Sequence, residues 1–246
     1  MKMSSLFASL MMLFISLSGY AYDSNYKKEA EIPEPLLFDL VRRVNSQKGE
    51  LEINSLFVNP GASEFKGLEI APEIEYAFSD GMAVEFELPT SQGRSHSYKG
   101  ALQFQLPSVI GDLTGLQLMH EKIHEKSWNE STILLLIGKR LNSKWSLFTM
   151  LGNRFVYGRD LEVKERSRDL PIANFNLFYD YGRSFDLGLE VNVRGVAASF
   201  EELIVMPQLH ALLEDDFKIQ FGFGASFDGY QTSPISALRL IKEFNH

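Results

Sequence analysis

Most of this chain divides into segments of about ten residues in which apolar and polar side chains alternate. In the stretch YAFSDGMAVEFELP, Ser79-Asp80-Gly81 is a tight-turn sequence, because Gly81 can take a positive φ and Asp80 tolerates one. Side chains alternate between the two faces of a strand, so this hairpin has one apolar face and one carboxylate-rich face. The chain must therefore build a sheet with two chemically different sides.

The turns have a regular spacing. Tight turns at 79–81, 142–144, 182–184 and 214–216, with a looser candidate at 107–112, alternate with longer polar stretches at 90–98, 125–131, 157–169 and 227–233. Alternating short turns and long loops are typical of outer-membrane barrels. The pattern predicts about twelve strands, with both termini of the chain on the tight-turn side. The predicted strands are 50–58, 67–78, 82–90, 98–106, 113–123, 132–141, 145–156, 170–181, 185–195, 202–213, 217–227 and 235–244.

Two architectures fit such alternation, a soluble sandwich and a membrane barrel. Aromatic residues gather beside the tight turns, as in an interfacial girdle, whereas a sandwich has no reason to place them at one end. These residues are Tyr76, Phe78, Trp145, Tyr179, Tyr181, Phe185 and Phe217. We therefore predict an all-β fold, an antiparallel transmembrane β-barrel of about twelve strands in the bacterial outer membrane.

The first residues have the pattern of an export signal. Lys2 precedes the apolar run 6–17, and Gly19-Tyr20-Ala21 is a small-x-small cleavage site, which predicts a cleaved signal peptide over 1–21. We expect 22–48 to be a periplasmic N-terminal segment and 49–246 to be the barrel. Within that segment, EPLLFDLVRRV is compatible with a short amphipathic helix or an extended arm.

The strands predicted at 132–141 and 145–156 are exceptions to the alternation, because ILLLIG is apolar on both faces. A barrel interior could hold these apolar residues against the N-terminal segment.

Charge and cysteine content exclude some functions. The formal net charge is −8, which argues against nucleic acid as a partner. The chain has no cysteine, so it has no disulfide framework and no thiolate metal site.

Three segments, KGELEIN (48–54), GLEIAPEIEYAFSDGMAVEFELP (67–89) and YKGALQFQLP (98–107), resemble a family of bacterial outer-membrane transporter barrels, the phenol-degradation meta-pathway type. The resemblance implies a barrel that passes small hydrophobic or aromatic molecules, with no catalytic residue. Such barrels commonly end on an aromatic residue that the barrel assembly machinery recognises, whereas here Phe244 lies two residues before the end.

One motif suggests different chemistry. HEKIH, His120 to His124, matches H-E-x-x-H, which on a helix would bind zinc with Glu121 as general base. The surrounding alternation predicts a strand instead, where the two histidines would be about 13 Å apart, too far for one metal. We predict no metal, no cofactor and no catalytic residue, and keep two alternatives: a lipid-directed or zinc-dependent outer-membrane hydrolase, and a structural or adhesive barrel with functional loops.

The predicted function is a channel or passive transporter for small solutes, with outer-membrane lipid and lipopolysaccharide around it. The polar faces predict a charged lumen, with acids on the second and third strands and bases, including Lys99 and Arg194, on later ones. Opposed charges across a pore would set its selectivity, but they could also pair and seal the interior. The predicted pathway residues are Glu73, Glu75, Glu85, Glu87, Arg154, Asn176, Glu190, His210, Gln220 and Arg239.

Overall fold

The computed structural model describes residues 32–38, 40–59, 67–124, 128–158, 167–182, 184–195, 200–214 and 216–244. The predicted signal peptide and most of the loop predicted at 157–169 lie outside the described residues. Among the described residues, no helix is long and apolar enough to cross a membrane.

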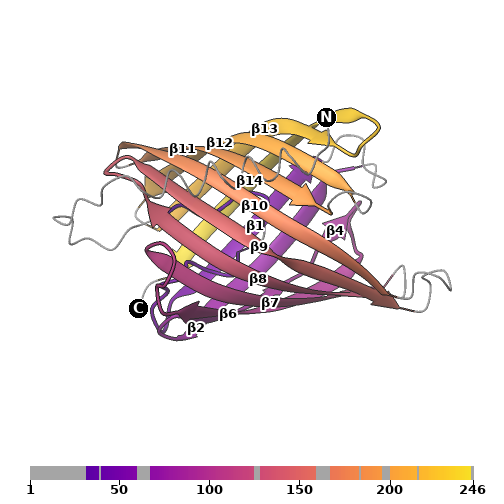
Figure 1. The fold of residues 1–246 in the computed structure, drawn as a ribbon, viewed down its shortest axis with the longest axis horizontal. Helices are drawn as coiled ribbons and strands as arrows, with labels where there is room; N and C mark the ends of the chain where they lie inside the picture. Colours follow the sequence, from indigo (N-terminus) through magenta and orange to yellow (C-terminus); the bar gives the residue numbers. More distant parts are fainter. Residues whose placement is uncertain are drawn as a thin grey trace.

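Twelve long antiparallel strands form one closed sheet, as the turn spacing predicted (Figure 1). Each strand pairs with the next along the chain, and β1 pairs with both β2 and β14, which closes the barrel. Within the stretch predicted as the loop 90–98, β4 and β5 form a short hairpin of two residues per strand, and β4 pairs with β2. The strands are β1 (Leu51–Asn59), β2 (Glu69–Ser79), β3 (Met82–Glu87), β4 (Thr90–Ser91), β5 (Arg94–Ser95), β6 (Ser97–Leu106), β7 (Leu113–Ile123), β8 (Trp128–Arg140), β9 (Trp145–Gly158), β10 (Ser167–Gly182), β11 (Phe185–Arg194), β12 (Glu202–Glu214), β13 (Phe217–Phe227) and β14 (Thr232–Phe244).

Closure has a direct physical reason. Lipid offers no hydrogen bonds to an open strand edge, so every edge of a membrane sheet must be paired. The β1–β14 pairing runs without a break from Leu51 opposite Phe244 to Asn59 opposite Ser236. The first and last strands of the barrel therefore meet along the full length of β1.

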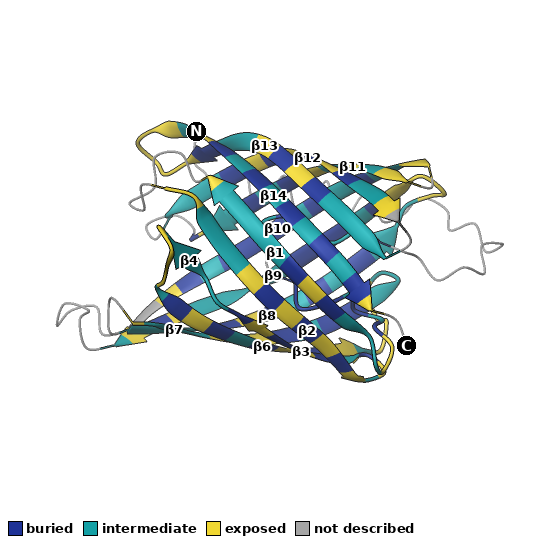
Figure 2. Ribbon diagram, turned by 180° about the vertical axis from the view of Figure 1, so that it is seen from behind, coloured by how far each residue is buried: buried dark blue, intermediate teal, exposed yellow. Residues whose placement is uncertain are grey.

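The two faces of the barrel differ as the alternation predicted. Buried and more exposed residues alternate along the strands in Figure 2. Large apolar side chains lie on the outer face, and those exposed there include Ile74, Phe86, Leu118, Leu187, Phe221 and Phe223. Buried polar residues occupy the inner face, and they include Glu75, Glu85, Gln103, Gln117, Asn176 and Glu190. The carboxylates of the β2–β3 hairpin therefore face inward.

Aromatic rings mark the tight-turn end. Trp145, at the start of β9, packs against Tyr179 of β10 with ring centroids 4.9 Å apart. Lys144 donates a hydrogen bond to the Tyr179 hydroxyl at 3.3 Å. Tyr76, Phe78 and Phe185 are exposed near the same end. An amphipathic belt of this kind suits the membrane–water interface.

Residues 32–38 and 40–50 form no helix, and apart from the exposed Gln47 and Lys48 they are buried or half-buried within the barrel. The described part of EPLLFDLVRRV forms neither the helix nor a strand, and its backbone bends at 36–38 and 41–42. Its apolar side chains are buried against inward-facing residues of β8–β10 on one side and of β12 and β14 on another. The predicted division of the chain at residues 21 and 48 stays a prediction, but the described part of 22–48 fills the lumen. We call the described residues 32–38 and 40–50 the luminal segment.

Gly152 of β9 provides a test of the strand packing. A Cβ at this position would lie 1.8 Å from the Ile133 carbonyl oxygen and 3.0 Å from Leu134 Cα, both on β8. We expect Gly152→Ala to lower the free energy of unfolding by about 1–3 kcal/mol, because the backbone has to move to admit the methyl group. Urea unfolding in lipid vesicles measures this. Gly100→Ala is the matched control, since the nearest atom to its Cβ would be 3.7 Å away, and an equal loss in both variants would contradict the prediction.

Candidate functional site

The Glu190 side chain of β11 binds the luminal segment at residues 36–38. Its carboxylate accepts hydrogen bonds from the backbone N–H groups of Leu36 (2.9 Å), Leu37 (3.1 Å) and Phe38 (2.9 Å). The amides of Asn174 (3.0 Å) and Asn192 (2.9 Å) donate to the same carboxylate. Five donors on one buried carboxylate satisfy both the charge and the irregular backbone beside it.

The next part of the segment is fixed by side chains of β1, β6 and β7. Arg42 is fully buried and its guanidinium contacts Glu52 of β1 at 2.6 Å and Glu50 at 2.9 Å. Burial works against its charge, but Glu52 and other nearby carboxylates raise the pKa of Arg42 above its ordinary value. Gln103 of β6 donates to the Arg42 carbonyl at 2.6 Å, and Gln117 of β7 accepts from Val41 N–H at 3.3 Å.

Apolar contacts complete the packing. Ile32, Leu40 and Val44 are buried against residues of the β8–β10 wall, and these are Leu134, Leu136, Phe148, Met150, Ile172 and Phe178. Leu36 packs against Ile204, Met206, Ile235 and Ala237. The two-sided apolar character of ILLLIG is thus explained, because its inward residues meet the luminal segment.

A cavity of about 130 Å³ remains between the luminal segment and the strand ends that lead into the long loops. Leu37 and Phe38 of the segment contribute to its lining, together with Met119, Leu134 and Ile172. Its polar lining is Thr132 and five charged residues of both signs, from β6, β7, β8, β9 and β11: Lys99, Glu121, Glu130, Arg154 and Arg194. Arg154 contacts Glu130 at 3.0 Å. The cavity can hold a small molecule that has both an apolar part and a charged or polar group.

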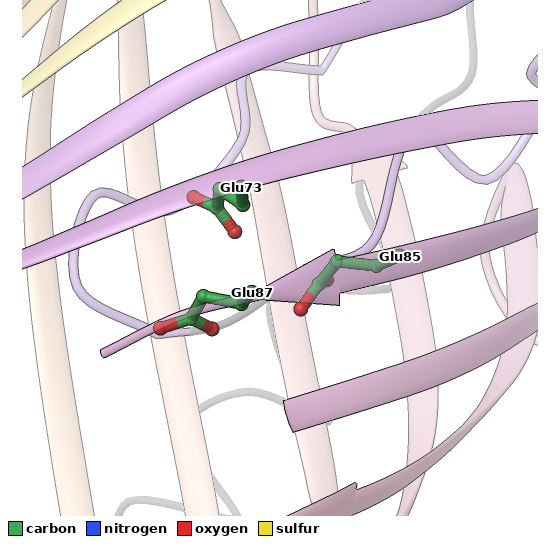
Figure 3. A group of neighbouring side chains, drawn as sticks. All are labelled: Glu73, Glu85 and Glu87. Carbon is green, nitrogen blue, oxygen red and sulfur yellow. The ribbon is translucent and has the colours of Figure 1, made fainter. Parts of the chain in front are cut away.

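The predicted acidic residues are buried together on β2 and β3. The carboxylates of Glu73, Glu85 and Glu87 are drawn in Figure 3, with ligand oxygens all within 4.8 Å of one another. Lys99 of β6 is bonded to Glu87 and lies 3.5 Å from Glu85. Arg239 of β14 lies 3.7 Å from Glu73. These bases therefore pair with the acids from nearby strands instead of facing them across an open pore.

The other predicted pathway residues have separate positions. Arg154 is the one predicted pathway residue that lines the cavity, while Glu190 anchors the luminal segment. Asn176 belongs to a chain of amides with Asn174 on β10. His210 contacts Gln208 at 3.1 Å and the ring of Phe178. Gln220 is buried on β13.

The strand pattern did not identify several residues of the cavity. Glu121 was considered only within the histidine motif. Glu130 was assigned to a loop, because the predicted strand starts at 132, four residues after β8 begins at Trp128. Leu37 and Phe38 belong to a segment without periodicity, so nothing in their pattern placed them in the lumen. The one sequence signal for an apolar segment in the lumen was the apolar inner face of β8 and β9, because such a face needs an apolar partner.

HEKIH does not form the helical zinc geometry. His120 and Glu121 belong to β7, and His124 follows the strand. His120 Nδ1 lies 3.1 Å from the Ser131 hydroxyl, and the His124 ring contacts Tyr98 at a centroid distance of 4.4 Å. The two histidines therefore have different partners.

Together, the closed barrel, its apolar exterior and its polar interior define the architecture of an outer-membrane channel protein. No protein-family model and no curated protein sequence matches the chain. Solved structures of this architecture do match.

The NanC porin has a TM-score of 0.59 at 7% identity, covering 80% of this chain and 100% of that one. The COG4313 outer membrane channel from Pseudomonas putida F1 has a TM-score of 0.58 at 12% identity, covering 84% and 100%. The KdgM porin in complex with oligogalacturonate has a TM-score of 0.57 at 12% identity, covering 80% and 99%. The chain is thus similar in fold to outer-membrane porins and channels.

The anchoring by Glu190 can be tested with a single introduced cysteine, since the chain has none of its own. Leu36→Cys places a thiol at a fully buried position of the luminal segment. We expect Glu190→Gln to speed labelling of this thiol by a maleimide about tenfold, because a neutral amide weakens charge-assisted hydrogen bonds. The rate is measured in proteoliposomes. The control is Glu202→Gln, because the Glu202 carboxylate of β12 contacts Arg194 of β11. This variant should leave the labelling rate unchanged.

Proposed function

We propose that the chain is a bacterial outer-membrane channel for small solutes, in which the luminal segment narrows the passage to a selective path. The observation that carries the proposal is the filled lumen. A closed barrel with an apolar exterior holds most of the luminal segment inside and keeps a charged cavity beside it. Similarity in fold to the porins and channels above supports a role in passage across the membrane.

The cavity suggests what kind of solute passes. Leu37, Phe38 and Met119 offer an apolar surface, and Arg154 and Arg194 offer guanidinium groups within the same lining. A small amphipathic molecule fits both parts. The resemblance of 48–107 to barrels of the phenol-degradation meta-pathway type supports the same class, small molecules with an aromatic or other apolar body. We propose outer-membrane lipid, lipopolysaccharide and the barrel assembly machinery as the surroundings and partners of the barrel.

Conductance tests the channel and its narrowing together. In planar bilayers we expect wild-type protein to show small single-channel currents, and a variant lacking residues 32–48 to show currents several times larger, because the deleted residues occupy the lumen. Faster migration of unboiled protein in gel electrophoresis verifies that the shortened chain still forms a closed barrel. Equal currents from two folded proteins would show that the segment does not limit passage, and no current from either would refute the channel.

Ion selectivity tests the cavity. Arg154→Gln removes one positive charge from the lining, and we expect the reversal potential in a salt gradient to shift toward cation preference. Lys242→Gln is the matched control, because Lys242 contacts Asp216 near a tight turn at the other end of the barrel. An equal shift in both variants would mean that the cavity is not on the conducting path.

A further inference from the structure

Among the described residues, the inner face of β1–β3 holds more buried carboxyl groups than basic groups that pair with them. Five glutamates are buried there: Glu52, Glu73, Glu75, Glu85 and Glu87. In the described part of the chain, Arg42, Lys99 and Arg239 form the ion pairs that reach this group. Three basic groups serve five buried carboxyl groups, and Arg42 also contacts Glu50, whereas buried charges are normally paired or bound to metal.

Three of these carboxylates converge. Oxygens of Glu73, Glu85 and Glu87 all lie within 4.8 Å of one another, although Glu73 belongs to β2 and the other two to β3 (Figure 3). Two oxygens bound to the same Ca²⁺ at about 2.3–2.6 Å can be separated by up to about 5 Å. The spacing therefore suits a single ion held by three side chains.

A second observation concerns buried oxygens outside this group of three. Glu75 Oε2 and Asn54 Oδ1 are buried and accept no hydrogen bond from any described residue. Both residues lie on the same inner face, Glu75 directly opposite Glu85 and Asn54 directly opposite Glu73 in the strand register. Within the group, Glu73 Oε2 and both oxygens of Glu85 also lack a hydrogen bond. Buried acceptors without donors are costly, and one cation satisfies several at once.

The donor set selects the ion. Carboxylate and amide oxygens are the ligands of hard cations, and neither histidine nor cysteine belongs to the group. Ca²⁺ accepts an irregular arrangement of side-chain oxygens, whereas Mg²⁺ requires shorter bonds and near-octahedral geometry. We propose that Glu73, Glu85 and Glu87 form a Ca²⁺ site in the wall of the lumen, with Glu75 and Asn54 supplying further oxygens beside it.

Lys99 makes the proposal more specific. Its ammonium group is bonded to Glu87 and lies 3.5 Å from Glu85, so it competes with any cation for these two carboxylates. A calcium site therefore predicts opposite effects for two substitutions. Glu85→Gln removes a ligand and should weaken binding, whereas Lys99→Gln removes the competitor and should strengthen it.

The test is titration of CaCl₂ into the mature chain, refolded in detergent from inclusion bodies and treated with EDTA, with binding followed by calorimetry. Refolding avoids lipopolysaccharide, which itself binds divalent cations. We expect one Ca²⁺ per wild-type chain, at least about tenfold weaker binding for Glu85→Gln, and tighter binding for Lys99→Gln. Glu202→Gln, an acid of β12 that contacts Arg194, is the matched control and should bind as wild type does.

Migration of unboiled protein in gel electrophoresis verifies that each variant is folded. If folded wild-type protein takes up no Ca²⁺, or if all variants bind equally, the site is refuted and protons or water satisfy the carboxylates instead. The proposal does not depend on passage of a solute, because the titration measures binding alone and the bilayer currents can fail or succeed independently of it.

Discussion

The structure depends on the pairing of β1 with β14. Lipid cannot hydrogen-bond an open strand edge, so the sheet has to close, and it closes along the whole of β1 from Leu51 to Asn59. Closure fixes which side chains face inward on every strand, because a shift by one residue would turn each apolar row into the lumen. The inward position of the glutamates at 73, 75, 85 and 87 is therefore a consequence of barrel closure and of the apolar residues between them.

Closure also creates an interior that has to be filled. Inward residues of β8–β10 are apolar, and apolar side chains that face water gain nothing from folding. The luminal segment resolves this by covering them with Ile32, Leu40 and Val44, while Glu190 binds the backbone groups that an irregular chain cannot pair by itself. The same segment leaves a charged cavity toward the long loops. The packing of the interior and the shape of the cavity are thus both set by one stretch of chain.

Much of the fold could be predicted because it follows from a period of two. The twelve strands, the position of the first strand's start and the last strand's end on the tight-turn side, and the outward apolar rows all follow from alternation and turn spacing. Contacts across the interior have no such period. Arg239 and Glu73 are far apart in sequence, yet they meet because β14 and β2 are both neighbours of β1. The pattern placed both residues inward but did not show that they are partners.

The luminal segment was harder to predict for a related reason. Its residues 32–38 and 40–50 form neither helix nor strand, so no periodicity marks which side chains point where. Its orientation is determined by the barrel: Arg42 needs the acidic face of β1, and the N–H groups of residues 36–38 need Glu190 of β11. Reversing the segment would bury Arg42 away from the acids and leave Glu190 without three of its donors. The uneven distribution of charge around the wall therefore selects one orientation, and with it the place where the cavity opens.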